Sequence, residues 1–479
     1  MKAMKDLRNK KVLVVGLAKS GLATTEFLVT KGARVTVTDH LPASELGSTA
    51  DAAKELGCSL ALGGHPLEVF TQADLIVVSP GVPLDLQELK EAQRRSIPIM
   101  GELELASRFL HLPVVAISGT NGKTTTTELV GDMLRRSGKR VFVGGNIGNP
   151  LITIHQAEEG FEMAVVEVSS FQLDSMETFH PQVAVLLNIS EDHLDRYDSF
   201  ADYVASKCRL FANQAADDTA VVPARDPLIG MHCTIRSRQL NFSLTKPSAH
   251  AYLESGKLIS RIMPGPKRRY DLRRWQLAGN HNRQNLLAAV LAATCAGAVP
   301  EAIQKSIDNF NPLPHRMELT HHWRGIRFYN DSKATNVDSV VRSLESFTAP
   351  VILIAGGRDK EGSYAPLTAL VRQRVKMLVL MGEARFRLAK ALGKLSCTVV
   401  VDDMEAAVQV ALDGAAPGDV VLLSPACSSF DLYENYQARG DHFRSLVTEW
   451  IAGKKQTAGG VSCPWIAPDG DRRKLNAHN

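Results

Sequence analysis

The sequence Val-Val-Ala-Ile-Ser-Gly-Thr-Asn-Gly-Lys-Thr runs from Val114 to Thr124 and decides the fold of the middle of the chain. Its first five residues have the apolar, β-branched composition of a buried strand. The residues from Thr125 to Arg136 are compatible with a helix. The stretch therefore predicts a strand, a glycine-rich loop and a helix in direct succession.

The glycine-rich loop has the composition of a phosphate-binding site. Its glycines let backbone N–H groups turn toward phosphate oxygens, and the N-terminus of the following helix favours negative charge. Lys123 can neutralise phosphate charge, and the hydroxyl of Thr124 can bind Mg²⁺. The common nucleotide loop has a further glycine five residues before Gly122, where this chain has Ile117. The loop is therefore a shorter form, and a plain glycine turn remains an alternative.

Polar residues follow two of the next apolar runs. Glu167 ends the run from Ala164, and His193 lies in a polar cluster just after Asn188. Open parallel sheets bind ligands at the carboxyl ends of their strands, and Mg²⁺ prefers hard oxygen ligands. These residues are therefore candidate metal ligands, although a solvated glutamate and a surface histidine remain alternatives.

Strand-like runs alternate with helical stretches along the chain, which predicts an α/β protein with parallel sheets covered on both faces. Proline-containing seams occur at Pro98 to Gly101 and at Asn311 to Pro314. We expect a Rossmann-like domain at 1–101, a central P-loop ATPase-like domain at 102–312, a Rossmann-like domain at 313–453 and a flexible tail at 454–479. The strand-like runs are Val12 to Val15, Val35 to Thr38, Leu75 to Ser79, Val114 to Ser118, Ala164 to Val168, Val183 to Asn188, Val351 to Ala355, Met377 to Met381 and Val420 to Ser424.

The composition is that of an ordinary globular protein. The 55 basic and 51 acidic side chains leave a net charge of +4, and they are interspersed, so nothing indicates binding to nucleic acid or to an anionic membrane. The longest apolar stretch, Leu286 to Val299, is shorter than a membrane span and is expected to be a buried helix. Seven cysteines without a CxxC pair predict reduced thiols, with no disulfide framework or zinc site. We expect a cytoplasmic protein.

The first loop of the chain imitates a dinucleotide fingerprint. Gly16 to Gly21 follows a strand-like run, and Asp39 ends the next run about 20 residues later. Ala18 stands where the fingerprint has the glycine that lets a pyrophosphate approach. NAD is therefore disfavoured, and a purely structural turn remains an alternative.

Five motifs in one order resemble the Mur ligases, and the resemblance covers about residues 11 to 450. Two further stretches, 331–336 and 424–431, are similar to the D-glutamate-adding branch of that family. The five motifs are Gly-Thr-Asn-Gly-Lys-Thr at 119–124, Gly-Gly-Asn-Ile-Gly at 144–148, Glu-Val-Ser-Ser-Phe-Gln-Leu at 167–173, Glu-Asp-His-Leu-Asp-Arg-Tyr at 191–197 and Gly-Asn-His-Asn-Arg-Gln-Asn at 279–285.

The resemblance implies an ATP-dependent ligase of cytoplasmic peptidoglycan precursor synthesis. It would join D-glutamate to UDP-N-acetylmuramoyl-L-alanine through an acyl phosphate, with two Mg²⁺ ions and a carbamylated Lys207. It implies neither a nucleic-acid partner nor stable membrane insertion, and we expect a monomer. From its residues alone, Lys207 reads as an ordinary lysine on a helix surface.

The resemblance also implies a role for each matched position. Lys123, His193 and Lys207 would be catalytic. The implied metal site consists of Thr124, Glu167, His193 and Lys207. The residues implied to hold ATP are Gly119, Thr120, Asn121, Gly122, Lys123, Thr124, Thr125, Asn285, Arg316 and Asp331. The implied substrate contacts are Lys19, Ser20 and Asp39 for the UDP moiety, Asn146 and Ser169 for the nucleotide sugar, and Thr335, Lys360, Ser429 and Tyr436 for D-glutamate.

Three other functions fit part of the sequence. A sister ligase for another amino acid would share the central motifs, but the contexts of Ser332 to Lys333 and Ser429 argue against it. An NAD-dependent oxidoreductase would explain residues 11 to 39 and leave Lys123 and Glu167 without a role. A nucleotide-binding switch would use the phosphate loop without an amino-acid site.

Overall fold

The computed structural model describes residues 6–156, 160–193, 196–263, 265–277, 279–311, 313–360 and 362–453. The contacts within it define two compact units. Unit 1 is built from Met1–Ile189, Ala201–Arg274 and Gln284–Asn309, and unit 2 from Ser190–Phe200, Trp275–Arg283 and Phe310 onward. The tail predicted at 454–479 lies outside the described residues.

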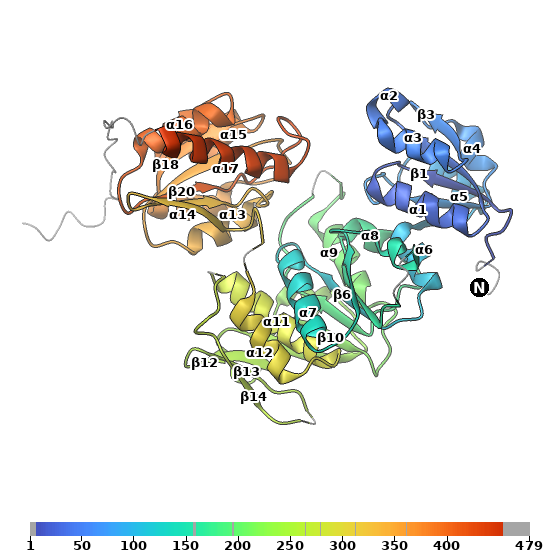
Figure 1. The fold of residues 1–479 in the computed structure, drawn as a ribbon, viewed down its shortest axis with the longest axis horizontal. Helices are drawn as coiled ribbons and strands as arrows, with labels where there is room; N and C mark the ends of the chain where they lie inside the picture. The colour runs from blue at the N-terminus through green and yellow to red at the C-terminus, as the bar shows by residue number, and fades with distance from the viewer. Residues whose placement is uncertain are drawn as a thin grey trace, which may run out of the picture. The chain divides into compact units, whose positions relative to one another are not determined.

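Unit 1 begins with a five-stranded parallel sheet of order β3-β2-β1-β4-β5 (Figure 1). The central strand β1 is buried along most of its length because Val12 to Val15 are all apolar. The sheet order reverses at β1, which has β2 on one side and β4 on the other. This switch point places the loop after β1 where ligands bind in open α/β sheets. The elements are β1 Lys11–Val15, α1 Lys19–Thr30, β2 Arg34–Asp39, α2 Ala43–Leu46, α3 Ser48–Glu55, β3 Ser59–Leu62, α4 Leu67–Thr71, β4 Leu75–Val78, α5 Gln87–Arg94 and β5 Ile99–Gly101.

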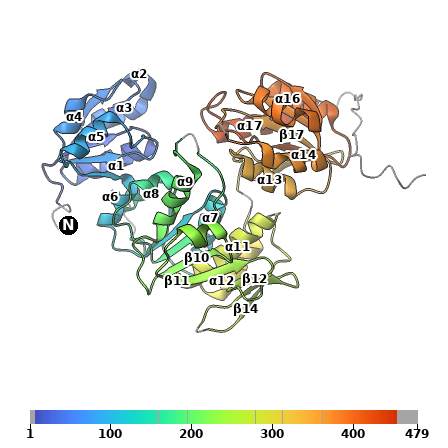
Figure 2. The same cartoon turned by 180° about the vertical axis from the view of Figure 1, so that it is seen from behind.

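The second sheet of unit 1 has nine strands in the order β14-β13-β12-β11-β10-β9-β6-β8-β7. The strands from β6 to β12 pair in parallel. At one edge, β12, β13 and β14 form an antiparallel meander. Figure 2 shows β10, β11 and β12 side by side toward that edge. The strands are β6 Val114–Ser118, β7 Val141–Gly145, β8 Met163–Glu167, β9 Val183–Leu186, β10 Thr219–Pro223, β11 Arg238–Ser243, β12 Ala251–Glu254, β13 Lys257–Ser260 and β14 Arg268–Asp271.

The helices of this part of the chain include the apolar one expected from Leu286 onward. In the structure α11 begins at Asn280 and ends at Cys295, and Leu286 to Ala293 are buried throughout. A helix buried on all sides needs no amphipathic pattern, which explains its even hydrophobicity. The helices are α6 Glu102–Phe109, α7 Lys123–Arg136, η2 Leu151–Gln156, α8 Ser170–Asp174, α9 Phe200–Cys208, η3 Arg209–Phe211, α10 Pro227–His232, α11 Asn280–Cys295 and α12 Pro300–Asn309.

Unit 2 contains a six-stranded sheet of order β15-β16-β20-β17-β18-β19, in which β15 alone pairs antiparallel. Alternate residues of its buried strands enter two separate cores, one under α13, α14 and α15 and one under α16 and α17 (Figure 1). The sheet is therefore covered on both faces, as the sequence predicts. The elements are β15 Glu318–Trp323, β16 Ile326–Asn330, α13 Val337–Glu345, β17 Val351–Gly356, η4 Ala365–Leu367, α14 Thr368–Arg374, β18 Val375–Met381, α15 Arg385–Leu392, η5 Gly393–Leu395, β19 Cys397–Val400, α16 Met404–Gly414, β20 Val420–Leu423 and α17 Tyr436–Gly453.

One expectation about the cysteines is wrong. Cys208, at the end of α9, forms a disulfide with Cys233, which caps the C-terminus of α10. The fold brings these two helix ends together, with Cα atoms 4.9 Å apart, although 25 residues separate them and no local motif marks the pair. Among the described residues, no helix has both the length and the apolar character needed to cross a membrane.

Candidate active site

The phosphate loop has the backbone geometry that its glycines predict. Gly119 and Gly122 have φ angles of 149° and 87°, in the region that side chains disfavour. Lys123 folds back over the loop, and its Nζ donates to the carbonyls of Gly119 and Thr120 at 2.8 and 2.9 Å. Because α7 begins at Lys123 directly after Gly122, the loop ends at a helix N-terminus. This arrangement can hold a polyphosphate between helix amides and an ammonium group.

The loop is fixed to two other segments of unit 1. Asn188, after β9, accepts from the backbone N–H of Asn121 and donates to its carbonyl, both at 2.9 Å. On the other side, the buried side chain of Asn285 in α11 lies against Gly122, where a Cβ would come within 2.3 Å of its Oδ1. The sequence predicts Asn285 as a nucleotide neighbour, and the structure places it beside the phosphate loop.

Two oxygen-bearing side chains that the sequence predicts as metal ligands lie next to the loop. Thr124, at the start of α7, donates its hydroxyl to Oε2 of Glu167 at 2.7 Å, and Asn146 donates to Oε1 of the same carboxylate at 2.9 Å. Glu167 ends β8, the strand adjacent to β6, and is 2% exposed. A hydroxyl and a carboxylate at this distance fit Mg²⁺. No group of three or more His, Cys, Asp or Glu side chains within the described ranges is placed to hold a metal by itself.

Lys207 is buried, which contradicts its reading as a surface lysine. Its side chain lies on the inner face of α9, is 2% exposed, and donates from Nζ to the carbonyl of Gly119 at 3.0 Å. The Nζ lies 4.6 Å from the centre of the Tyr203 ring, and the Tyr203 hydroxyl lies 3.0 Å from Oγ1 of Thr120. The α9 helix therefore supplies two side chains that contact the phosphate loop.

In the first sheet of unit 1, Asp39 fixes the loop that follows β1. Both carboxylate oxygens of Asp39 accept backbone amides, from Leu17 at 2.7 Å and from Leu41 at 3.0 Å. Lys19, at the start of α1 beside Ser20, donates from Nζ to the carbonyl of Gly148 at 2.6 Å. Gly148 belongs to the Gly-Gly-Asn-Ile-Gly motif, so the structure brings Lys19, one of the residues predicted for UDP, to the motif that contains Asn146.

Ser169 begins α8 with a complete capping box. Its hydroxyl accepts from the backbone N–H of Gln172 at 3.3 Å, and the Gln172 side chain accepts from the Ser169 backbone N–H at 3.0 Å. A capping box fixes the first turn of a helix. The cap holds Ser169 two residues after Glu167, at the carboxyl end of β8.

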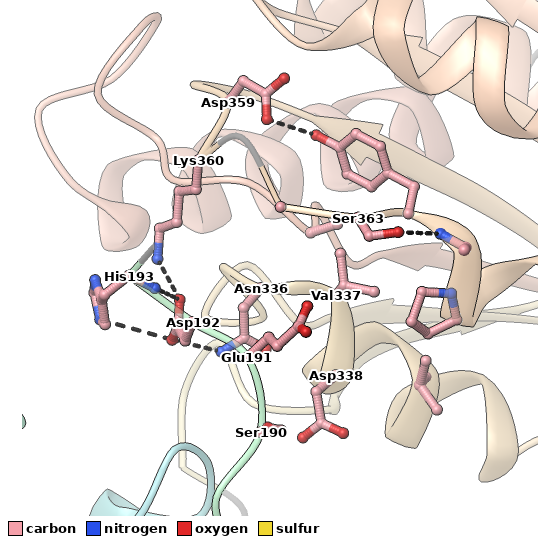
Figure 3. A pocket seen from close by; sticks show the side chains of 16 residues that line it. Ser190, Glu191, Asp192, His193, Asn336, Val337, Asp338, Asp359, Lys360 and Ser363 are labelled. Carbon is pink, nitrogen blue, oxygen red and sulfur yellow. Dashed lines mark hydrogen bonds and ion pairs between the residues drawn. The ribbon is translucent and has the colours of Figure 1, made fainter. Parts of the chain in front are cut away.

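Unit 2 contains a pocket of about 430 Å³ with a charged end and an apolar end (Figure 3). The charged end is formed by Asp192, His193 and Lys360, and the apolar end by residues of α13 and η4. His193 and Ala426, both in the lining, have φ angles of 54° and 62°. Backbone of this kind in residues other than glycine is uncommon and concentrates at functional sites.

Lys360 is one of the predicted D-glutamate contacts, and it forms an ion pair with Asp192 at 3.1 Å. Asp192 also accepts from Nδ2 of Asn336 at 2.9 Å, and Asn336 is the N-cap of α13 (Figure 3). Burial alone would raise the pKa of Asp192, but the charges of Lys360 and His193 and the two hydrogen bonds lower the pKa to about 2. The carboxyl is therefore ionised at neutral pH.

The other predicted D-glutamate contacts do not belong to the lining of this pocket. Thr335 directly precedes Asn336, Ser429 is 2% exposed, and the ring centre of Tyr436 lies 4.0 Å from Nζ of Lys333. The buried guanidinium of Arg439, which sequence reasoning missed, links Ser332 to the loop of Cys427 and Ser428. It donates to the Ser332 hydroxyl and to the carbonyls of Ser332, Cys427 and Ser428.

Asp331 is buried and lies directly after the end of β16. Its carboxylate accepts from the hydroxyls of Ser343 and Ser424 at 2.6 and 2.9 Å and from the Met317 amide at 3.1 Å. Burial raises its pKa to about 6, although these hydrogen bonds and the charge of Arg316 act in the opposite direction. The structure thus brings two predicted nucleotide neighbours, Asp331 and Arg316, into one region of unit 2.

Comparisons with known proteins match most of this chain. Residues 10–101 match the Mur ligase MurD-like N-terminal domain, 117–293 the Mur ligase middle domain, and 315–427 the Mur ligase glutamate ligase domain. The chain is 46% identical over 449 residues to the UDP-N-acetylmuramoylalanine–D-glutamate ligase of Geotalea daltonii, covering 94% of this chain and 99% of that protein. The ligase of the same name from Desulfosudis oleivorans is 48% identical over 450 residues, 94% of this chain and 98% of that one. This chain belongs to the Mur ligase family.

Solved structures show the same Mur ligase fold at low sequence identity. The UDP-N-acetylmuramate–alanine ligase of Thermotoga maritima has a TM-score of 0.59 at 18% identity, covering 93% of this chain and all of that one. A pseudomurein peptide ligase type C from Methanothermus fervidus has a TM-score of 0.59 at 22% identity, covering 92% and all of that chain. These similarities confirm the three α/β domains that the sequence predicts.

The predicted site residues of this Mur ligase gather in two groups. Unit 1 contains Gly119 to Thr125, Glu167, Lys207, Asn285 and the residues predicted for the nucleotide sugar, whereas unit 2 contains His193, Arg316, Asp331, Lys360 and the remaining D-glutamate contacts. Sequence reasoning gave no role to Asp192 or Asn336, although both lie inside motifs that it quoted. The position of Asp192 directly before His193, a predicted metal ligand, could have marked it as a site residue.

Proposed function

We propose that this Mur ligase joins D-glutamate to UDP-N-acetylmuramoyl-L-alanine at the expense of ATP, in cytoplasmic peptidoglycan precursor synthesis. The observation that carries the proposal is the similarity of 46–48% identity, over almost the entire chain, to ligases that bear this name. The residues present fit each part of the reaction.

Activation of the acceptor carboxylate comes first, because a carboxylate repels an attacking amine and offers no leaving group. The terminal carboxylate oxygen of the L-alanine attacks the γ-phosphorus of ATP, which breaks the bond to ADP and gives an acyl phosphate. The ammonium of Lys123, held over the loop by two carbonyls, opposes the negative charge on the transferring group. The α7 N-terminus acts in the same direction.

Thr124 and Glu167 would hold magnesium beside the phosphates, with His193 and a carbamylated Lys207 supporting two ions. Bound Mg²⁺ would supply charge neutralisation across the phosphate oxygens. The burial of Lys207 supports carbamylation, because a buried ammonium is costly and its neutral amine is the form that reacts with CO₂. Asn146 orients the Glu167 carboxylate from the side opposite Thr124.

The amine of D-glutamate then attacks the acyl phosphate. The tetrahedral intermediate collapses, expels inorganic phosphate, and leaves an amide, while the amine loses its protons to solvent or to a neighbouring base. Lys360 offers an ammonium for a substrate carboxylate, and Thr335, Ser429 and Tyr436 complete the amino-acid site. Lys19, Ser20, Asp39, Asn146 and Ser169 bind the nucleotide sugar, and the protein acts as a monomer with domains at 1–101, 102–312 and 313–453.

The test is phosphate release with ATP, Mg²⁺ and UDP-N-acetylmuramoyl-L-alanine, comparing D-glutamate, L-glutamate, L-alanine and a diamino acid, with mass spectrometry of the product. We expect release that depends on D-glutamate, a product heavier by one glutamyl residue, and loss of both in Lys123→Met. Phosphate release with another amino acid, and not with D-glutamate, would show that the other amino acid is the substrate. Absence of release with all four would refute the ligase.

A further inference from the structure

The ammonium of Lys360 is positioned by a residue from a distant part of the chain. Asp192 and Lys360 are 168 residues apart in sequence, and Oδ1 of Asp192 accepts from Nζ of Lys360 at 3.1 Å (Figure 3). The two side chains are 8% and 19% exposed. Partial burial excludes much of the water that weakens surface ion pairs. The contact therefore holds the two side chains in a fixed relative position.

Two of the other acids that line the pocket have cationic partners of their own. Asp359, its neighbour in sequence, accepts from Arg387 at 2.6 Å and from the Tyr364 hydroxyl at 3.1 Å. Asp338, on α13, forms an ion pair with Arg342 at 2.8 Å. Among the described residues, the ion pair of Lys360 is the one with Asp192.

Asp192 also fixes the segment that contains another predicted D-glutamate contact. Its Oδ2 accepts from Nδ2 of Asn336, whose Oδ1 caps α13 by accepting from the Ser339 amide at 2.8 Å. Thr335 directly precedes Asn336. One carboxylate thus connects the lysine loop and the start of α13.

We propose that Asp192 is a positioning residue for D-glutamate, which holds the Lys360 ammonium in the pocket and keeps it in register with the Thr335–Asn336 segment. An ammonium has three donors, so its bond to Asp192 leaves directions in which it can meet a substrate carboxylate. The proposal rests on the proposed function for the identity of the amino acid. The geometry on which it stands lies within unit 2.

The kinetic test uses Asp192→Asn, which keeps the size of the side chain and removes its charge. We expect the KM for D-glutamate to rise about tenfold while the KM values for ATP and Mg²⁺ change less than twofold, since the loss acts through Lys360. The matched control is Asp419→Asn, because Asp419 forms an ion pair of similar burial with Lys376 at 2.7 Å in the same unit. The control should leave the KM for D-glutamate unchanged.

A double-mutant cycle then asks whether Asp192 acts through Lys360. In a Lys360→Met background, Asp192→Asn should cause no further loss of kcat/KM for D-glutamate, because the ammonium it positions is gone. The same tenfold loss in both backgrounds would overturn the proposal. A fall in kcat with an unchanged KM for D-glutamate would also overturn it, since that result would assign Asp192 to the neighbouring His193.

A second measurement needs no substrate. Mass spectrometry can follow the acetylation rate of Lys360 in the free enzyme, where the bond to Asp192 should protect the amine. We expect the rate at Lys360 to rise severalfold in Asp192→Asn and the rate at Lys376 to stay constant. An unchanged rate at Lys360 would refute the contact. If the wild-type enzyme rejects D-glutamate, the proposed function fails, and this measurement still decides whether Asp192 holds the Lys360 ammonium.

Discussion

Lys207 donates a hydrogen bond from its buried ammonium to the carbonyl of Gly119, 88 residues earlier in the chain. Because Gly119 opens the phosphate loop, the bond ties the α9 helix to the nucleotide site of the proposed ligase. Tyr203, one turn earlier on the same helix, contacts Thr120 of that loop. The state of Lys207 should therefore matter for catalysis more than for folding.

Lys207→Met should lower kcat at least a hundredfold, because the variant removes the group proposed to become a carbamate beside the magnesium site. The thermal midpoint should change little, since methionine keeps the buried stem. A ¹³C signal of a carbamate should appear when wild-type enzyme is incubated with ¹³C-bicarbonate and should be missing in the variant. Lys257→Met, at an exposed position of β13, serves as the control. A carbamate signal that persists in Lys207→Met would contradict the assignment.

Gly122→Ala should weaken ATP binding at least tenfold. The new Cβ would lie 2.3 Å from Oδ1 of Asn285, and the φ angle of 87° disfavours any side chain. Gly230→Ala is the matched control, because a Cβ there meets nothing within 4 Å and alanine favours the α10 helix. Fluorescence titration with an ATP analogue compares the two variants. Equal affinity in both would show that the loop tolerates the change.

Asp331→Asn should change the pH dependence of stability. The pKa of Asp331 is about 6 in the folded chain against 3.8 as its ordinary value, so the folded state binds more protons between these values and stability falls as the pH rises through them. Above pH 6 the buried carboxylate costs about 3 kcal/mol, and a neutral asparagine avoids this cost.

The measurement is urea unfolding of the wild type and Asp331→Asn at pH 4, 5, 6 and 7.5. The stability of the variant relative to the wild type should increase from pH 4 to pH 6 and then stay constant. Parallel curves for the two proteins across this range would show that Asp331 does not take up a proton on folding.

The Cys208–Cys233 disulfide should be detectable as a linked peptide in a digest made without reductant. Cys233→Ser should lower the free energy of unfolding of unit 1 by about 3 kcal/mol, as expected for a loop of this length. Cys58→Ser, which removes a free cysteine of the same unit, should change stability by much less. If reductant has no effect on the wild-type unfolding curve, the bond does not form in solution.

Inner strands of all three sheets follow from local sequence patterns. Every strand-like run that we expected forms a strand, because parallel strands buried on both faces need continuous apolar residues. The β12–β14 meander escaped notice, since its half-exposed strands contain charged residues such as Lys257 and Arg268. The pairing of Cys208 with Cys233 escaped for another reason: it depends on tertiary contacts.

Some residues of the candidate site could be predicted from the sequence and others could not. The phosphate loop could be recognised in the sequence because its glycines, lysine and threonine occur at a fixed spacing. The burial of Lys207 could not be read from the sequence, because a lysine on an amphipathic helix is usually exposed. Asp192 and Arg439 were missed since each has a hydrogen-bond partner more than a hundred residues away in the chain. The divisions at 101 and 312 remain predictions.

The composition of unit 2 has a consequence for biosynthesis. Ser190–Phe200 belong to this unit although unit 1 supplies the chain on both sides of them. Asp192 leaves the ribosome 168 residues before Lys360, a delay of roughly 10 to 30 s at ordinary rates of translation. During that time the nascent chain displays a carboxylate whose lysine has not yet been made. The pocket that contains Asp192 and Lys360 can therefore assemble only late in translation, after most of unit 1 has had time to fold.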